Sequence, residues 1–134
     1  MRVKNAIIVT MLILTLLVTI CVPANAEDVD EVVPSRLTYI NTYSSSITHG
    51  TFSTTVKASV SGKSSVTKIK IKMELQKEKD GAYSTVKTWE ETFYSRNAYK
   101  EESKATSPTA TYRLKTTITV YAGSNSETIY TYAY

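Results

Sequence analysis

The sequence is poor in the residues on which most catalytic and metal sites depend. It has one cysteine, one histidine and four glycines in 134 residues. Cys21 lies in an apolar N-terminal run, and the chain after that run has no thiol for a disulfide, a nucleophile or a metal site. His49 would have to be the base of any serine-hydrolase triad, but no Gly-x-Ser-x-Gly motif and no aspartate close in sequence accompany it. We therefore expect a protein that is not an enzyme and that holds no metal and no cofactor.

The N-terminal segment has the features of a signal peptide. Arg2 and Lys4 give it a basic start, and residues 6–22 carry no charge. The alanines of the motif Ala24-Asn25-Ala26 form the small-x-small pattern that signal peptidase recognises. The sequence predicts a signal peptide over residues 1–26, cleaved after Ala26, and a protein that is secreted and either free or associated with the cell wall.

Two alternatives for this segment stay open. The apolar run could be kept as a membrane anchor, although it is short for a span and ends in a good cleavage site. Cys21 could carry the lipid of a bacterial lipoprotein, although Ile20 is not the small residue that such sites require before the cysteine. After residue 26, no run is long and apolar enough to span a membrane.

Cleavage would leave a chain with little net charge. Residues 1–26 hold two of the basic residues and none of the acidic ones, so the net charge of +4 falls to +2. A charge this small predicts no strong overall attraction to polyanions, and any basic character has to be local. We expect residues 27–35 to form a flexible acidic leader and residues 36–134 to form a single domain.

The rest of the chain has the pattern of strands and turns, without helical periodicity. We expect a loop over residues 44–50, a turn over 61–64 and a hairpin turn at Lys79-Asp80-Gly81. Strands are predicted over 37–43, 51–61, 67–77, 83–94, 97–105, 111–121 and 127–134. This number and spacing favour an all-β, antiparallel immunoglobulin-like β-sandwich of about seven strands, with a jelly roll or a small barrel as alternatives.

Alternation within the strands predicts which residues form the core. The apolar residues of one parity are Phe52, Val56, Ala58 and Val60, then Ile69, Ile71, Met73 and Leu75, then Tyr112, Leu114, Ile118 and Val120. Val86 and Trp89 differ in parity, so either a bulge separates them or one of them faces out. Tyr112 stands where immunoglobulin-like sandwiches often carry a tyrosine whose hydroxyl bonds the preceding corner.

Two runs, KIKIKMELQKEKDGAYSTVKTW and TYRLKTTITVY, resemble a family of small secreted proteins of Gram-positive bacteria whose function is uncharacterised. The matching residues are Ile69, Ile71, Leu75, Gln76 and Lys77, then Tyr83, Val86 and Trp89, then Tyr112, Arg113 and Lys115. The chain departs from the family pattern at Tyr83, where a Trp is expected, and at Ala110, where a Gly is expected. The resemblance implies export and a sandwich fold, and it supplies no catalytic residue.

The closing stretch ETIYTYAY places Tyr130, Tyr132 and Tyr134 on one face of a strand. If the preceding loop has two residues (124–125) or four (123–126), Val120 pairs with Ile129, and the three tyrosines face outward. A loop of three or five residues would turn them into the core. The even loop matches apolar residues with apolar residues, so we expect the outward arrangement.

The strands over 67–77, 111–121 and 127–134 should be neighbours in one sheet. Its outer surface would then hold Lys68, Lys70, Lys72, Arg113, Lys115, Tyr130, Tyr132 and Tyr134. These residue types are also ordinary on solvated strands, where lysine protects sheet edges. As a functional surface, they predict a binding module for an anionic or glycan polymer of the cell surface, without specificity for nucleic acid. The alternative is an interaction protein that self-associates, or that pairs with a partner chain, through its C-terminal edge strand.

Overall fold

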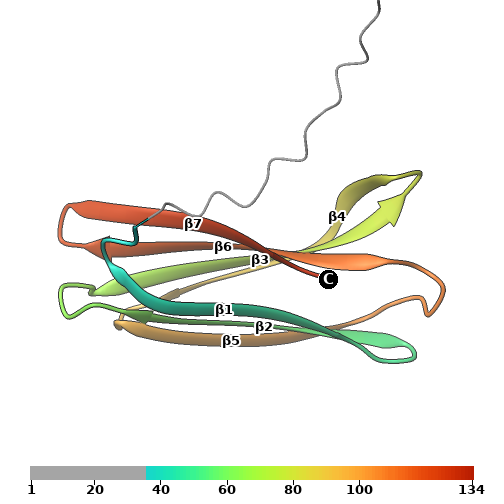
Figure 1. Ribbon diagram of the computed structural model, residues 1–134. Coiled ribbons are helices and arrows are strands. Elements are labelled where there is room, and N and C mark those ends of the chain that lie inside the picture. Colours follow the sequence, from blue (N-terminus) through green and yellow to red (C-terminus); the bar gives the residue numbers. More distant parts are fainter. Residues whose placement is uncertain (1–35) are drawn as a thin grey trace, which may run out of the picture.

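The computed structural model describes residues 36–134, which form a β-sandwich of two antiparallel sheets (Figure 1). The predicted signal peptide, its cleavage site at Ala24 and Ala26, and the acidic leader lie outside the described residues. The strands are β1 (Ile40–His49), β2 (Ser53–Gly62), β3 (Lys68–Lys79), β4 (Ala82–Phe93), β5 (Asn97–Ala105), β6 (Tyr112–Ala122) and β7 (Asn125–Ala133). The all-β, seven-stranded sandwich is therefore confirmed. Within residues 36–134, no helix could cross a membrane.

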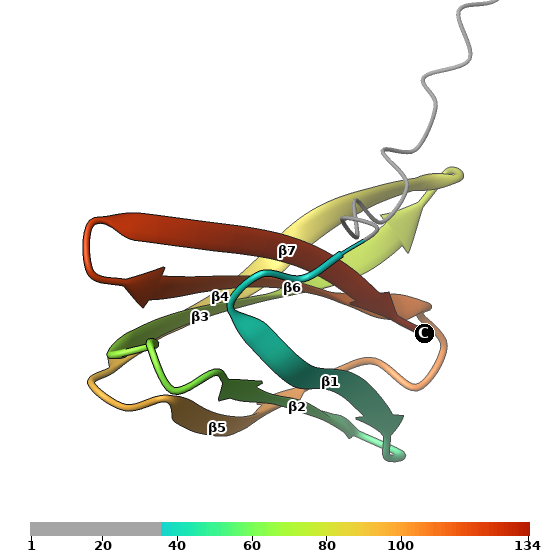
Figure 2. The ribbon, with the colours of Figure 1, turned by 60° about the vertical axis from the view of Figure 1, so that its left-hand side comes forward.

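One sheet has the order β1-β2-β5 and the other has the order β4-β3-β6-β7. The prediction that the third, sixth and seventh strands are neighbours is confirmed. Figure 2 shows the three-stranded sheet as one layer and the four-stranded sheet as the other, with the tip of the β3–β4 hairpin projecting beyond the paired layers. The edge strands β4 and β5 lie along one flank of the sandwich, and β1 and β7 lie along the other.

The core lies between the sheets and follows the predicted alternation closely. Ile69, Ile71, Met73 and Leu75 of β3 are completely buried, and so are Leu114, Ile118 and Val120 of β6, while Tyr112 is nearly so. The opposite sheet contributes Val56, Ala58 and Val60. Phe52 contradicts the prediction, because it precedes β2 in the hairpin turn and is 71% exposed. Thr54 takes the first inward position of β2 instead.

Both two-residue hairpin loops use positive backbone φ angles. Lys79 pairs with Ala82 across the loop Asp80-Gly81, whose φ angles are 54° and 79°. Positive φ at both central residues defines the type I′ turn, which matches the twist of the flanking strands. The predicted hairpin turn is thus confirmed. Gly123 opens the loop between β6 and β7 with a φ of 63°, a value that a residue with a β-carbon rarely adopts.

Residues 44–50, predicted as a loop, mostly belong to a strand instead. β1 runs to His49 and pairs with β2 along its whole length. The polar residues fit because hydroxyl groups satisfy each other across the pair and across the sandwich: Ser44 bonds Ser59 at 3.0 Å, and Ser45 bonds Thr116 of β6 at 2.7 Å. A strand at the edge of a sheet can hold such a polar run because half of it faces water.

The irregularity predicted in the fourth strand is a β-bulge. Leu75 pairs with Lys87 and Gln76 pairs with Thr85, so Val86 is the extra residue. Val86 is 40% exposed, whereas Trp89 lies opposite Met73 and packs partly buried against the core. Both alternatives in the prediction therefore apply, since a bulge is present and Val86 faces out.

Tyr112 ties the start of β6 to the turn before it. Its ring is buried, and its hydroxyl accepts a hydrogen bond of 3.2 Å from the backbone N–H of Ser107. The predicted bond to the preceding corner is confirmed. It fixes the chain reversal between β5 and β6 and thereby positions Arg113, the next residue, on the outer side of the sheet.

The flank between β1 and β7 is closed by a glutamate. The carboxylate of Glu127 on β7 accepts hydrogen bonds from the backbone N–H groups of Thr38, Tyr39 and Ile40 at 2.7, 2.8 and 3.2 Å. Lys63 holds the same segment from the other side, since its ammonium donates to the carbonyl of Thr38 at 2.6 Å. The first described residues are thus attached to the last strand.

The flank between β4 and β5 is closed by a lysine. Lys100 of β5 is only 9% exposed, and its Nζ lies 2.8 Å from the carboxylates of both Glu91 on β4 and Glu102 on β5. Burial lowers the pKa of Lys100, but the two carboxylates raise it by more, so its pKa lies above the ordinary value. The group remains charged and links the two sheets.

Candidate functional site

Seven of the eight residues predicted as a surface lie on the outer side of the four-stranded sheet, and Tyr134, which follows β7, lies at the end of that sheet. Lys68, Lys70 and Lys72 come from β3, Arg113 and Lys115 from β6, and Tyr130, Tyr132 and Tyr134 from the end of the chain. Their buried neighbours of opposite parity, such as Ile71, Leu114 and Ile129, point into the core. We call these eight residues, with the acids and rings that the structure adds below, the outer face.

The register between β6 and β7 confirms that Tyr130 and Tyr132 face outward, and it corrects the predicted pairs. The loop has two residues, but they are Gly123-Ser124, so Ile118 pairs with Ile129 and Thr117 pairs with Tyr130. The predicted pairing of Val120 with Ile129 is wrong by two residues. A shift of two keeps each side chain on its face. Tyr130 is accordingly 39% exposed, Tyr134 is 71% exposed and Tyr132 is half-buried.

Two of the three β3 lysines predicted as site residues are neutralised by acids on the same face. Lys70 pairs with Glu90 of β4 at 3.0 Å, and Lys72 pairs with Glu74 at 3.7 Å. Neither acid was predicted as a site residue. Glu74 is visible in the alternation of its strand, but the side on which Glu90 lies depends on the bulge at Val86, which shifts the parity of β4.

This neutralised part of the outer face contains a shallow depression of about 150 Å³. Lys70, Lys72 and Glu90 line it together with Thr117, Thr119 and Tyr121. The lysines there are both ion-paired, so the depression offers hydroxyls and one aromatic ring beside these matched charges.

The remaining cations lie over aromatic rings. The Nζ of Lys68 is 4.0 Å from the centre of the Tyr121 ring, and that of Lys115 is 5.8 Å from the centre of the Tyr130 ring. Both distances allow the attraction between a cation and the negative face of an aromatic ring. Glu74 is directly opposite Lys115 in the register, but its ion pair is with Lys72.

Arg113 is enclosed more completely than any of these lysines. Its guanidinium carbon lies 3.9 Å from the centre of the Tyr83 ring and 4.6 Å from that of the Tyr132 ring. Nε donates a hydrogen bond to the side-chain carbonyl of Gln76 at 2.8 Å, and Nη1 reaches the hydroxyl of Tyr134 at 3.5 Å. Tyr83 was not predicted as part of the site because the bulge at Val86 separates it from Trp89, so the two rings face opposite sides of the sheet although they have the same parity in the sequence.

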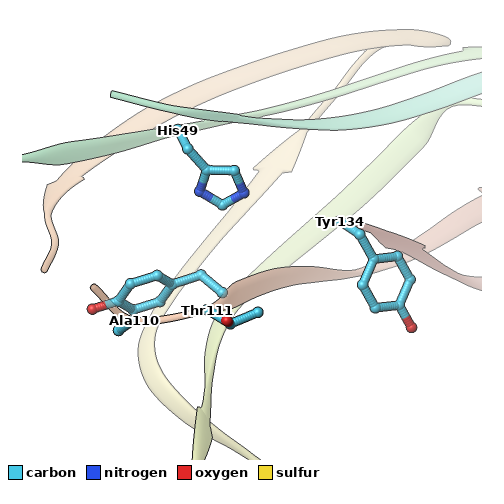
Figure 3. A pocket seen from close by; sticks show the side chains of 5 residues that line it. His49, Ala110, Thr111 and Tyr134 are labelled. Carbon is cyan, nitrogen blue, oxygen red and sulfur yellow. The ribbon is translucent and has the colours of Figure 1, made fainter. Parts of the chain in front are cut away.

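An open cavity of about 270 Å³ adjoins this corner at the end of the sandwich (Figure 3). His49 of β1 points across it toward the segment that carries Ala110 and Thr111, and the ring of Tyr134 lies at another side. Tyr134 therefore contributes both to the cavity and, through its hydroxyl, to the surroundings of Arg113. Residues 36–134 contain no group of three or more His, Cys, Asp or Glu that could hold a metal ion.

The outer side of the three-stranded sheet is different in chemistry. The hydroxyl of Tyr99 donates a short hydrogen bond to Glu101, which raises the pKa of Tyr99 and lowers that of Glu101. Lys57 pairs with the same carboxylate at 3.6 Å. The charged groups of this surface are thus bound to one another.

No family model matches the chain, and no curated protein matches it either. The resemblance to the secreted proteins of Gram-positive bacteria stays a prediction.

Proposed function

We propose that the protein is a secreted, non-enzymatic binding module with an immunoglobulin-like sandwich. Two observations support this version of the sandwich: β3, β6 and β7 are adjacent in one sheet, and the hydroxyl of Tyr112 bonds the preceding corner through Ser107. Export rests on the signal-peptide pattern of residues 1–26, and the resemblance to bacterial secreted proteins agrees with it.

The outer face of the four-stranded sheet binds, in this proposal, an anionic or glycan polymer at the cell surface. The observation that carries it is the group of tyrosines 83, 130, 132 and 134 around Arg113 and Lys115, two cations that form no ion pair within residues 36–134. Aromatic faces stack on sugar rings, and unpaired cations bind phosphate or carboxylate groups.

A triple change of Tyr130, Tyr132 and Tyr134 to Thr tests this function. Threonine keeps the preference for strands, and loss of cross-strand contacts costs about 0.2–1 kcal/mol for each ring. The variant should therefore fold, as circular dichroism would show, and should no longer sediment with insoluble cell-wall material. A folded variant that still binds as the unchanged protein does would contradict the proposal.

A second candidate follows from the position of β7 at the edge of its sheet. An edge strand offers unpaired N–H and C=O groups to which another strand can add, so β7 could join the sheet to a second copy or to a partner chain. Mass measured over a range of concentrations separates the two candidates. A dimer that the triple variant abolishes favours edge pairing, and a monomer at all concentrations favours the binding module.

A further inference from the structure

The side chain of Arg113 is held by more contacts than that of any other cation on the outer face. The rings of Tyr83 and Tyr132 flank its guanidinium, and Gln76 and Tyr134 bind two of its N–H groups. These contacts come from β4, β7 and β3, so three neighbouring strands fix one side chain of β6. Such a group has already lost the rotational freedom that an exposed arginine loses on binding.

The hydrogen bonds of Arg113 leave part of its capacity unused. A guanidinium carries five N–H donors. Nε uses its donor on Gln76 and Nη1 uses one on Tyr134, and no other acceptor within residues 36–134 bonds the group. One N–H on Nη1 and both on Nη2 therefore remain on a half-buried side chain. This is the edge that binds the two oxygens of a carboxylate or a phosphate.

The local charge favours the same ligand. Lys70 and Lys72 have their charges matched by Glu90 and Glu74, but neither Arg113 nor Lys115 forms an ion pair within the described chain. Arg113 and Lys115 are two residues apart on β6 and so share one side of the strand. Of the three outer-face cations that form no ion pair within residues 36–134, Arg113 and Lys115 thus lie together at this corner, whereas Lys68 lies beside Tyr121 at the opposite end of β3.

We propose that Arg113 is the residue that recognises an oxyanion, a carboxylate or a phosphate, on the polymer that the outer face binds. The guanidinium edge bonds two oxygens of the group, Lys115 adds a second positive charge, and the exposed rings of Tyr130 and Tyr134 contact the neighbouring part of the polymer. This inference rests on the proposed function, because it names the chemical group by which the polymer is recognised.

Titration of the complete secreted chain with three polymers tests the inference. Polygalacturonate presents carboxylates on sugars, linear polyphosphate presents phosphates without sugars, and dextran presents neutral sugars. Binding to one of the two polyanions identifies the source of the oxyanion. Arg113→Gln and Arg113→Lys should each weaken that binding about tenfold or more, since the loss of hydrogen bonds to a charged group is expected in both. Lys57→Gln is the matched control: it changes the net charge by the same amount, but it lies on the three-stranded sheet and pairs with Glu101 at 3.6 Å, so affinity should change less than about twofold.

Other outcomes overturn the inference in distinguishable ways. If Lys57→Gln weakens binding as much as Arg113→Gln, or if Arg113→Lys binds like the unchanged protein, the attraction is diffuse, and no specific role is left for Arg113. If the chain binds dextran with the same affinity as the polyanions, and if the Arg113 variants have unchanged affinity, the rings alone account for binding and the inference is wrong.

A chain that binds none of the three polymers would contradict the proposed function, and nuclear magnetic resonance then decides the inference separately. Inorganic phosphate and acetate are added while the Nε–H signal of Arg113 is followed. The signal is assigned by its disappearance in Arg113→Lys. A saturable shift in it supports an oxyanion site, and the absence of any shift overturns the inference.

Discussion

At the flank between β1 and β7, a carboxylate, that of Glu127, receives three backbone N–H groups. At the flank between β4 and β5, an ammonium, that of Lys100, lies between two carboxylates. The first arrangement attaches a segment of main chain to a strand, and the second joins side chains of two sheets. Removing the charge of Glu127 would therefore leave backbone N–H groups without an acceptor, whereas removing that of Lys100 would leave two carboxylates without a cation.

The two flanks also have something in common that bears on solubility. Glu127, Lys100 and Glu91 are charged residues on edge strands, and each points toward the interior of the sandwich rather than outward. Inward-pointing charges are one way in which natural sheets prevent another strand from adding to an edge, because that addition would bury the charge. The same interactions thus close the sandwich and protect its edges, and the position of Glu127 on β7 counts against the edge-pairing candidate.

The largest effect is expected for Glu127→Ala. The change removes one acceptor group and leaves the N–H groups of Tyr39 and Ile40, which lie in a partly buried region, without partners. Hydrogen bonds to charged groups contribute about 1.5–3 kcal/mol, so we expect a loss of about 2–3 kcal/mol in the free energy of unfolding. Denaturant unfolding measures the loss, and amide hydrogen exchange should show reduced protection at residues 39 and 40. Glu127→Gln keeps one acceptor oxygen and should recover part of the lost free energy of unfolding. A loss below about 0.5 kcal/mol in the alanine variant would mean that other contacts hold the segment.

A smaller loss, about 1–2 kcal/mol, is expected for Lys100→Ala. Breaking a fully buried ion pair costs about 3–5 kcal/mol, but the side chains of Glu91 and Glu102 are 50% and 33% exposed, and water screens them. Lys100→Met keeps the packing and should cost less than the alanine variant. Because Met removes the inward charge, light scattering should show more association in Lys100→Met than in the unchanged protein. Equal stability of all three proteins would show that this flank needs no charge.

The hydroxyl bond between Ser45 of β1 and Thr116 of β6 tests, without charge, how the edge strand β1 is joined to the opposite sheet. Thr116 is completely buried, so Thr116→Val leaves the hydroxyl of Ser45 without its partner and should cost about 1 kcal/mol. Adding Ser45→Ala should cost little more, because both polar groups are then gone. A double-mutant cycle from denaturant unfolding measures this coupling. Additive losses in the double variant would show that the two hydroxyls contribute independently.

The smallest effect concerns alkaline pH. The pKa of Lys100 is higher in the folded chain than in the unfolded chain, because two carboxylates stabilise the ammonium despite its burial. Its contribution is therefore fully present below about pH 10.4, the unfolded value, and is lost as the pH rises through the higher folded value. Compared with Lys100→Met, the unchanged protein should lose stability more steeply above about pH 10. If the free energy of unfolding changes with pH in the same way in both proteins, the raised pKa of Lys100 is contradicted.

Much of the fold is predictable from the sequence because its central strands alternate strictly. β3 and β6 each have sheet neighbours on both sides. Over residues 68–76 of β3 and along β6, the inward residues are apolar or hydrogen-bonded and the outward residues are polar or aromatic. The extent of β1 is not predictable in this way. Its inward positions include Ser45, whose hydroxyl is satisfied by Thr116 far away in the sequence, and no local pattern reveals such a partner.

The candidate site also has features that the sequence predicts and features that it does not. The facing of Tyr130 and its neighbours follows from parity, and parity survives the two-residue error in register. The ion pair between Lys70 and Glu90 could not be predicted, because it requires both the register of β3 with β4 and the position of the bulge at Val86. The stacking of Tyr83 on Arg113 depends on the same bulge.

The three hydrogen bonds of Glu127 also have a consequence for the order in which the domain is assembled. They join Thr38, Tyr39 and Ile40 to a residue 87 to 89 positions later in the chain, so the loop that they close is nearly as long as the domain. Closing so long a loop is slow unless intervening structure has first brought its ends together. We therefore expect the start of β1 to dock late, after β6 and β7 have paired, and hydrogen-exchange labelling during refolding should protect residue 118 before residues 39 and 40. A chain that crosses a membrane N-terminus first would then expose its first strand without this attachment until nearly all of it has emerged.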